Sequence, residues 1–271
     1  MASMRGVRIG LIGAGAIGGV VIDRLLNGAD AAAQDIIACE PRDARRDELA
    51  ARFKIRTTNN PVEAAAGELI VLALPPLEVA KTLQAIHGNL SHRPVIASFA
   101  AAVPISSLES MLPPGTPVVR INPNSPSVVG TGFNPVTYGS SVTGKARSVV
   151  DQFLAVLGGT VEIEDAAMNA YTALSAVGPT YFLPVLDAMI GAGMELGLSR
   201  EAAVAAATET ARGTAEMAAK RPESPEQLKL FTGLRPLKDA EVRDLVKQAI
   251  ADAVGRMTAL QQKITAGPSR A

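Results

Sequence analysis

Aromatic residues are scarce in this sequence. Trp is absent, and Phe, Tyr and Trp together make up only 3% of the 271 residues. The core must therefore be packed from Ala, Val, Leu and Ile, a composition that favours closely packed helices. Cysteine occurs once, at Cys39, which excludes an internal disulfide and fits a reducing cytoplasm. The two histidines, His87 and His92, have no Cys or acidic cluster near them in the sequence, so we predict no metal site.

The chain also lacks a charge imbalance and a long apolar run. It carries 26 Lys and Arg against 26 Asp and Glu, which provides no general attraction to nucleic acid or to an anionic membrane. The uninterrupted apolar runs are shorter than the ~18 residues that span a bilayer, so we expect no membrane partner. With 48% hydrophobic and 19% charged residues, the composition is that of a globular, cytoplasmic protein long enough for two domains.

Short β-branched runs alternate with helical segments in the first half. Strands are expected at 7–12, 35–39, 69–74, 94–99 and 117–121, with helices at 15–27 and 41–53. Residues 69–74 are almost continuously apolar, as in a parallel strand covered on both faces. A helix at 143–157 and a short strand at 160–163 follow. Repeated β-α-β units predict an α/β fold with a doubly wound parallel sheet of the Rossmann type.

A glycine motif, RIGLIGAGAIGGV, joins the first strand to the first helix. Gly13 permits the tight turn, Gly15 lets a pyrophosphate approach the backbone, and Gly18 lets the helix pack against the strand. The N–H groups of Ala16 and Ile17 then lie at the positive end of the helix dipole. The spacing and its place between a strand and a helix predict dinucleotide binding.

Two charged residues after the second strand bear on which nicotinamide cofactor is used. Glu40 lies 22 residues after Gly18 and is the natural partner of a ribose diol, which favours NAD(H). Arg42 could instead hold a 2′-phosphate, which leaves NADP(H) possible. The alternative for Arg42, Arg45 and Arg46 is a solvated helix face paired with Asp43, Asp47 and Glu48.

The ends of the later strands should line the same cofactor cleft. Leu74 and Pro75 follow the third long strand, and Ala100 follows the fourth. Asn122 and Asn124 follow the fifth, where their side-chain amides could contact the cofactor. A plain capped turn is the alternative for that Asn-Pro segment.

The second half is helical, with helices expected at 166–175, 180–196, from 199 to before Pro222, and at about 238–264. We therefore divide the chain into a dinucleotide-binding domain, 1–163, and a helical dimerisation and substrate domain, 164–271. Gly and Ala are dense on the middle helices, which allows close helix packing. Small residues and wide apolar faces together predict a homodimer or higher homo-oligomer.

The sequence resembles the pyrroline-5-carboxylate reductase family over nearly its whole length. The resemblance rests on residues 9–19, on VVRINPNSPSVVGTG at 118–132, and on residues 173–217. It implies a Rossmann domain, a helical dimerisation domain, and nicotinamide-dependent reduction of a small, cyclic, amino-acid-like imine at a site between the cofactor domain and helices of paired subunits. The family's Ser-Pro-Gly-Gly-Thr-Thr stretch is replaced here by FTGLRPL at 231–237.

Hydride transfer to a protonated imine needs positioning more than acid catalysis. The candidate catalytic residues are Thr180, Ser175, Asn122 and Thr232, with Tyr181, Thr214 and Arg235 as further polar candidates. Each hydroxyl could instead cap or back-bond a helix. A β-hydroxyacid dehydrogenase is one alternative, disfavoured because 165–198 contains no Lys or His for the proton transfer. A dinucleotide-binding sensor without turnover is the other.

Overall fold

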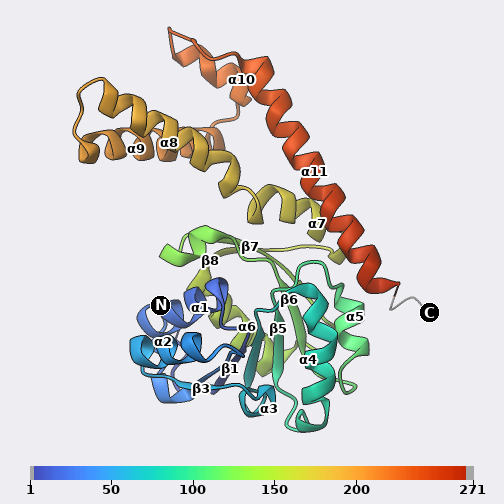
Figure 1. Cartoon of the computed structure of the whole chain (residues 1–271). Coiled ribbons are helices and arrows are strands. Elements are labelled where there is room, and N and C mark those ends of the chain that lie inside the picture. Colours follow the sequence, from blue (N-terminus) through green and yellow to red (C-terminus); the bar gives the residue numbers. More distant parts are fainter. Residues whose placement is uncertain (1–2, 267–271) are drawn as a thin grey trace. The chain divides into compact units, whose positions relative to one another are not determined.

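The structure is a computed structural model that describes residues 3–266 (Figure 1). The chain forms two compact units. One consists of the residues up to Val177 together with those from Asp252 onward, and the other is Gly178–Ala251.

The first unit is built on an eight-stranded sheet in the order β3-β2-β1-β4-β5-β6-β7-β8 within the described residues. Strands β1 to β6 run parallel to one another, and β7 pairs antiparallel with β6 and parallel with β8. The strands are β1 Ile9–Ile12, β2 Ile36–Cys39, β3 Arg56–Thr58, β4 Leu69–Leu72, β5 Val95–Ser98, β6 Val118–Ile121, β7 Gly132–Tyr138 and β8 Gly158–Glu162.

Helices cover both faces of this sheet. Because successive side chains of a strand point to opposite faces, Leu11 and Val71 enter one core while Ile12 and Leu72 enter another. The first core is completed by α1 (Ala16–Gly28), α2 (Asp43–Phe53) and α6 (Gly144–Leu157). The second is completed by α3 (Pro61–Ala64), α4 (Val79–Ile86) and α5 (Ile105–Ser110). The doubly wound α/β fold predicted from the sequence is confirmed.

Two strands and one helix differ from the sequence prediction, which also placed no helix at α3, α4 or α5. Strand β7 was not predicted, because Asn134 and Pro135 interrupt its apolar pattern and Pro lacks the N–H of a ladder bond. Strand β3 has only three residues and was also missed. The helix expected at 166–175 is a short α7 (Met168–Tyr171) that widens into a π-helical turn, η6 (Thr172–Ala176).

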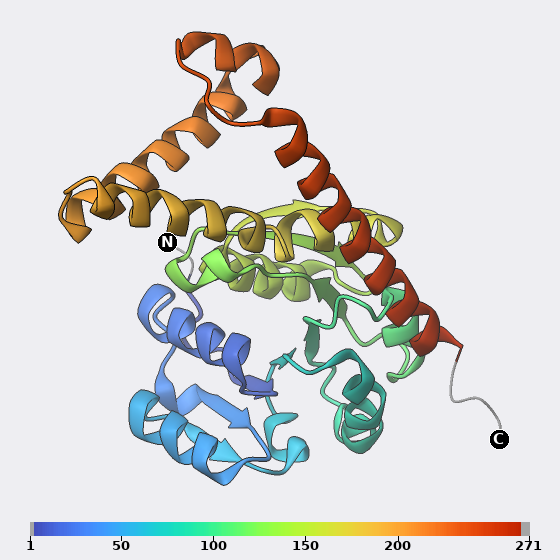
Figure 2. The same cartoon turned by 45° about the horizontal axis from the view of Figure 1, so that its top comes forward.

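The second unit contains α8 (Pro179–Glu195), α9 (Arg200–Lys220), α10 (Pro225–Leu228) and the first half of α11 (Asp239–Thr265). Helices α8 and α9 lie side by side (Figures 1 and 2). A Cβ on Gly193 would lie 3.1 Å from the Cβ of Ala203, so a small residue is needed where these helices meet. Ser199 accepts a hydrogen bond from the Ala202 N–H and caps α9.

Many apolar side chains of α8 are exposed. Phe182 is 68% exposed, Leu183 58% and Val185 55%. By length and composition alone, the helical stretch Asp165–Glu195 is also long and apolar enough to cross a bilayer. Among residues 3–266, no side chain covers this apolar face of α8.

Candidate cofactor-binding and active site

The three motif glycines lack a side chain for three different steric reasons. Gly13 has a φ of +94°, and a Cβ on it would lie 2.5 Å from the Ala73 carbonyl oxygen. A Cβ on Gly18 would lie 2.5 Å from the Gly13 carbonyl oxygen. A Cβ on Gly15 would meet no atom within 4 Å and would project into open space. Gly13 and Gly18 are thus required by the turn itself, whereas Gly15 leaves room for something outside the chain.

That room is part of a cavity of about 590 Å³ at the carboxyl ends of β1, β2 and β4. Its size is within the usual range for small-molecule sites. Six of the predicted cofactor residues line it: Gly13, Gly15, Glu40, Arg42, Leu74 and Pro75. The glycine turn, the acid and the Leu-Pro segment therefore meet at one site, where an open α/β sheet binds its ligands.

The remaining predicted cofactor residues lie along the same sheet edge. Ala16 and Ile17 form the first turn of α1, whose N-cap, Gly15, makes no side-chain capping bond. The first N–H groups of a helix have no partner within it, so this end suits an anion. Ala100 is buried in the loop after β5.

Glu40 is buried and paired with its neighbour. Only 3% of Glu40 is exposed, and its Oε1 accepts hydrogen bonds from Arg42 Nε at 2.6 Å and from the Arg42 N–H at 3.3 Å. Burial opposes ionisation of this carboxyl, but the bonds from Arg42 outweigh it and hold the pKa of Glu40 below its usual value. Glu40 is therefore ionised at neutral pH, with its charge partly compensated.

Arg45 and Arg46 do more than form a solvated face of α2, because both also donate hydrogen bonds to backbone carbonyls. Arg45 donates from Nε to the Ala14 carbonyl at 3.0 Å and from its guanidinium to the Gly15 carbonyl at 3.1 Å. Arg46 donates to the carbonyls of Glu40 and Pro41 at 2.8 and 2.9 Å. Both also pair with acids of α2. Arg45 thus braces the glycine turn, a role that the sequence analysis missed because its partners lie about thirty residues away.

The polar residues after β6 are tied to the π-helical turn. Asn122 Nδ2 donates to Thr172 Oγ1 at 2.6 Å, and Asn124 Nδ2 donates to the Ser175 carbonyl at 3.2 Å. Asn124 Oδ1 accepts from the Phe133 N–H at 3.0 Å. The structure therefore brings together three predicted residues, Asn122, Asn124 and Ser175, at the carboxyl end of β6.

The other predicted hydroxyls belong to the second unit. Thr180 is in the first turn of α8, and Thr232 follows a short 3-10 turn, Lys229–Phe231, and is exposed. Thr214 donates to the Thr210 carbonyl at 2.8 Å within α9, the back-bonded alternative foreseen for it. The active-site roles of Thr180 and Thr232 stay predictions.

A fully buried arginine was also missed. Arg120 on β6 is 0% exposed and pairs with Asp165 Oδ1 at 2.5 Å, while Asp165 Oδ2 accepts from the Ile105 N–H at 3.2 Å. Arg120 also donates to the Ala101 carbonyl. It therefore joins the sheet to the loop that contains Ala100 and to the segment that leads into α7.

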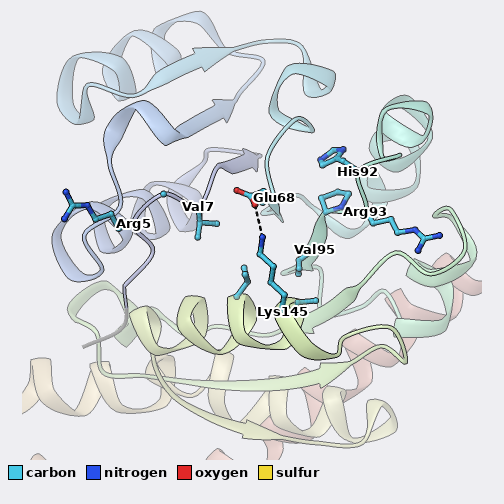
Figure 3. Close-up of a pocket in the computed structure, with 11 residues that line it drawn as sticks. Arg5, Val7, Glu68, His92, Arg93, Val95 and Lys145 are labelled. Carbon is cyan, nitrogen blue, oxygen red and sulfur yellow. Dashed lines mark hydrogen bonds and ion pairs between the residues drawn. The ribbon is translucent and has the colours of Figure 1, made fainter.

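A second cavity, of about 440 Å³, opens at the amino ends of the strands (Figure 3). At its centre Lys145 pairs with Glu68 at 3.4 Å, while Arg5 and Arg93 extend away on opposite sides (Figure 3). The positive charges do not converge, so this cavity does not form an anion site. Among residues 3–266, no group of three or more His, Cys, Asp or Glu lies so that it could hold a metal ion.

The glycine turn, the acid after β2 and the polar cluster after β6 define a class: Rossmann-type, nicotinamide-dependent oxidoreductases. Comparison with known proteins agrees. Residues 8–102 match the family model described as NADP oxidoreductase coenzyme F420-dependent, and residues 165–260 match that described as pyrroline-5-carboxylate reductase dimerisation.

Individual relatives give the same result. The pyrroline-5-carboxylate reductase of Mycobacterium leprae is 33% identical over 79% of this chain and 74% of its own. That of Pseudomonas aeruginosa is 32% identical over 95% of this chain and 98% of its own. A crystal structure of the Plasmodium falciparum pyrroline carboxylate reductase with NADP bound superposes with a TM-score of 0.83, at 23% identity, over 96% of this chain and 100% of that one. The chain belongs to the pyrroline-5-carboxylate reductase family.

Proposed function

We propose that this protein is an enzyme that reduces the C=N bond of pyrroline-5-carboxylate, or of a closely related cyclic imine, with a reduced nicotinamide cofactor. The observation that carries the proposal is the cavity at Gly15, which opens at the same sheet edge as the Asn122–Asn124 cluster in a chain of this family. Neither a hydroxyacid dehydrogenase nor a sensor is favoured by the relatives.

The residues at this edge fit a dinucleotide. We assign the pyrophosphate to Gly13, Gly15 and the first turn of α1 with Ala16, Ile17 and Gly18, because an uncapped helix end favours an anion. Leu74, Pro75 and Ala100 would line the path toward the nicotinamide, which supplies the hydride when bound. The chain's task is then to align the acceptor carbon and to hold its nitrogen, with Thr180, Ser175, Asn122 and Thr232 as the proposed positioning groups.

We propose that NAD(H) is preferred and NADP(H) accepted. Glu40 is ionised and lines the cavity, which suits a ribose diol and opposes a 2′-phosphate. The side chain of Arg42 is 66% exposed, so it has room to turn from Glu40 to a phosphate. One matched family model and the P. falciparum structure carry NADP in their names, which supports acceptance of NADP(H).

We further propose that residues 1–163 bind the cofactor and that residues 164–271 dimerise and help to bind substrate. Strand β8 ends at Glu162, and the dimerisation model begins at residue 165. The exposed apolar side chains of α8 fall within that model, so we assign their cover to a second copy rather than to a membrane. Light scattering after size exclusion should give a dimer or a larger homo-oligomer, and a monomer at micromolar concentration would contradict this.

We propose a cytoplasmic location, supported by the single thiol.

The decisive experiment is loss of NADH absorbance when the purified protein is mixed with pyrroline-5-carboxylate. We expect steady oxidation of NADH, with slower oxidation of NADPH. Tight NADH binding without turnover across cyclic imines and 2-oxo acids would instead indicate a sensor. Turnover of 2-oxo acids alone would indicate a hydroxyacid dehydrogenase.

A further inference from the structure

The π-helical turn η6 is an unusual local structure that needs support from outside itself. The Val177 N–H donates to the Thr172 carbonyl at 3.0 Å, which closes the wider i→i+5 ring. Such turns within helices are rare, are less stable than a regular α-turn, and occur frequently at functional sites.

The two asparagines after β6 hold the turn. Thr172 Oγ1 accepts from Asn122 and donates to the Met168 carbonyl at 2.7 Å, and both groups are buried. Asn124 uses its amide nitrogen on the Ser175 carbonyl and its oxygen on the Phe133 N–H. The amide nitrogens of both asparagines are thus used within the protein. They serve to fix the turn and are not free to donate to a substrate.

One polar atom of this cluster is left over. Ser175 Oγ is buried and has no hydrogen-bond partner among residues 3–266. Thr172 shows that a hydroxyl in this segment can reach the carbonyl four residues back, and Ser175 does not make that bond. Burial of a hydroxyl without a hydrogen-bond partner is unfavourable. This buried hydroxyl lies on a turn that is fixed at the carboxyl end of β6, where the proposed hydride transfer takes place. Its missing partner is therefore best explained by a polar group of a bound ligand.

We propose that Ser175 is a catalytic residue that receives the nitrogen of the bound imine. This rests on the proposed function. Its Oγ accepts a hydrogen bond from the N–H of the protonated C=N group. As hydride adds to the carbon, a C–H bond forms and the C=N π pair becomes the lone pair of the nitrogen, which keeps its proton. Reduced nicotinamide would supply this hydride from its C4–H bond and lose two electrons. No proton passes through Ser175, so the role of Ser175 is to aim the acceptor.

The test compares Ser175→Ala with a matched control, Ser106→Ala, at an exposed serine of α5. Besides turnover of the imine, the binding of two ligands is measured for each variant. L-Proline, the amine formed by reduction of pyrroline-5-carboxylate, is titrated by calorimetry with NAD⁺ present, and NADH is titrated alone. For Ser175→Ala we expect kcat/KM for the imine and affinity for L-proline to fall roughly 10- to 100-fold, as for a lost hydrogen bond to a charged group. NADH affinity should change less than about twofold. Ser175→Thr, which keeps the hydroxyl, should recover most of the loss.

Thermal unfolding separates this role from a structural one. Because Ser175 Oγ has no partner in the chain, Ser175→Ala should melt at the same temperature or higher. A lower melting temperature, unchanged turnover, or weaker NADH binding with normal L-proline binding would each overturn the inference. Wild-type turnover of the imine decides the proposed function by itself. A wild-type protein that neither reduces pyrroline-5-carboxylate nor binds L-proline would overturn the proposed function, and the role of Ser175 with it.

Discussion

Arg42 donates a hydrogen bond from Nε to Glu40 Oε1 over 2.6 Å, and the two side chains differ sharply in exposure. The Glu40 side chain is 4% exposed and that of Arg42 66%. The acid is therefore fixed at the cavity wall, whereas the exposed base has room to move. A ribose diol and a ribose phosphate would meet different members of this pair.

Arg42→Ala is expected to separate the two cofactors. The KM for NADPH should rise about tenfold or more, because a charge-assisted bond to the phosphate is lost. The KM for NADH should change less than about twofold. Steady-state kinetics with each cofactor tests this, with Arg5→Ala at the opposite sheet edge as the control. Equal effects on the two KM values would show that Arg42 does not distinguish the 2′-phosphate of NADPH from the 2′-hydroxyl of NADH.

Gly15→Val is expected to abolish cofactor binding with little loss of stability. No atom lies within 4 Å of a Cβ at this position, so the side chain would enter the cavity rather than the core. We expect the Kd for NADH to rise about 100-fold or more and the oligomer to persist. Gly88→Val is the control, since a Cβ there also meets open space but away from the cavity. Unchanged NADH affinity, measured by calorimetry, would exclude Gly15 from the site.

The cofactor half could be predicted from sequence because its signals are local. Gly13, Gly15 and Gly18 are close neighbours, and a strand, a turn and a helix start can be read around them. The acid at Glu40 follows from its place after the next strand. For the same reason the strands and their edge were predicted almost to the residue, apart from β3 and β7.

Long-range contacts could not be read in this way. Arg45 was interpreted only through its neighbours on α2, yet it reaches back to the Gly15 carbonyl. Nothing near Thr172 in the sequence marks a π-helical turn, because Asn122 supports it from 50 residues away. In the sequence, Arg120 is only a polar residue within an apolar strand. Its partners, Asp165 and the Ala101 carbonyl, are evident only in the folded chain.

Cys39 is expected to react slowly with thiol reagents. Burial, followed by the charge of Glu40, raises its pKa to about 11. At pH 8 only about 0.1% would be thiolate, against roughly a quarter of a free cysteine. Labelling by DTNB at pH 8 should therefore be about 100-fold slower in the native protein than in urea. It should accelerate as the pH rises toward 11, and Cys39→Ser should not label. Rapid native labelling at pH 8 would contradict the buried position.

Arg120→Met is expected to destabilise the first unit strongly. The guanidinium is fully buried and connects β6, the Ala101 carbonyl and Asp165. Methionine fills a similar volume but leaves the Ala101 carbonyl and the Asp165 carboxylate without this partner. Breaking a buried pair of this kind costs about 3–5 kcal/mol.

Urea unfolding followed by circular dichroism measures this loss. The matched control is Arg212→Met, which removes ion pairs with Glu209 and Glu216 on the exposed face of α9 and should leave the urea midpoint nearly unchanged. Arg120→Lys keeps the charge but cannot reach both partners with a fixed fork, so its midpoint should lie between those of the wild type and Arg120→Met. A urea midpoint of Arg120→Met equal to that of the wild type would contradict this role. It would show that Arg120 does not hold the Ala100–Ala101 loop, on the nicotinamide side of the site, to the sheet.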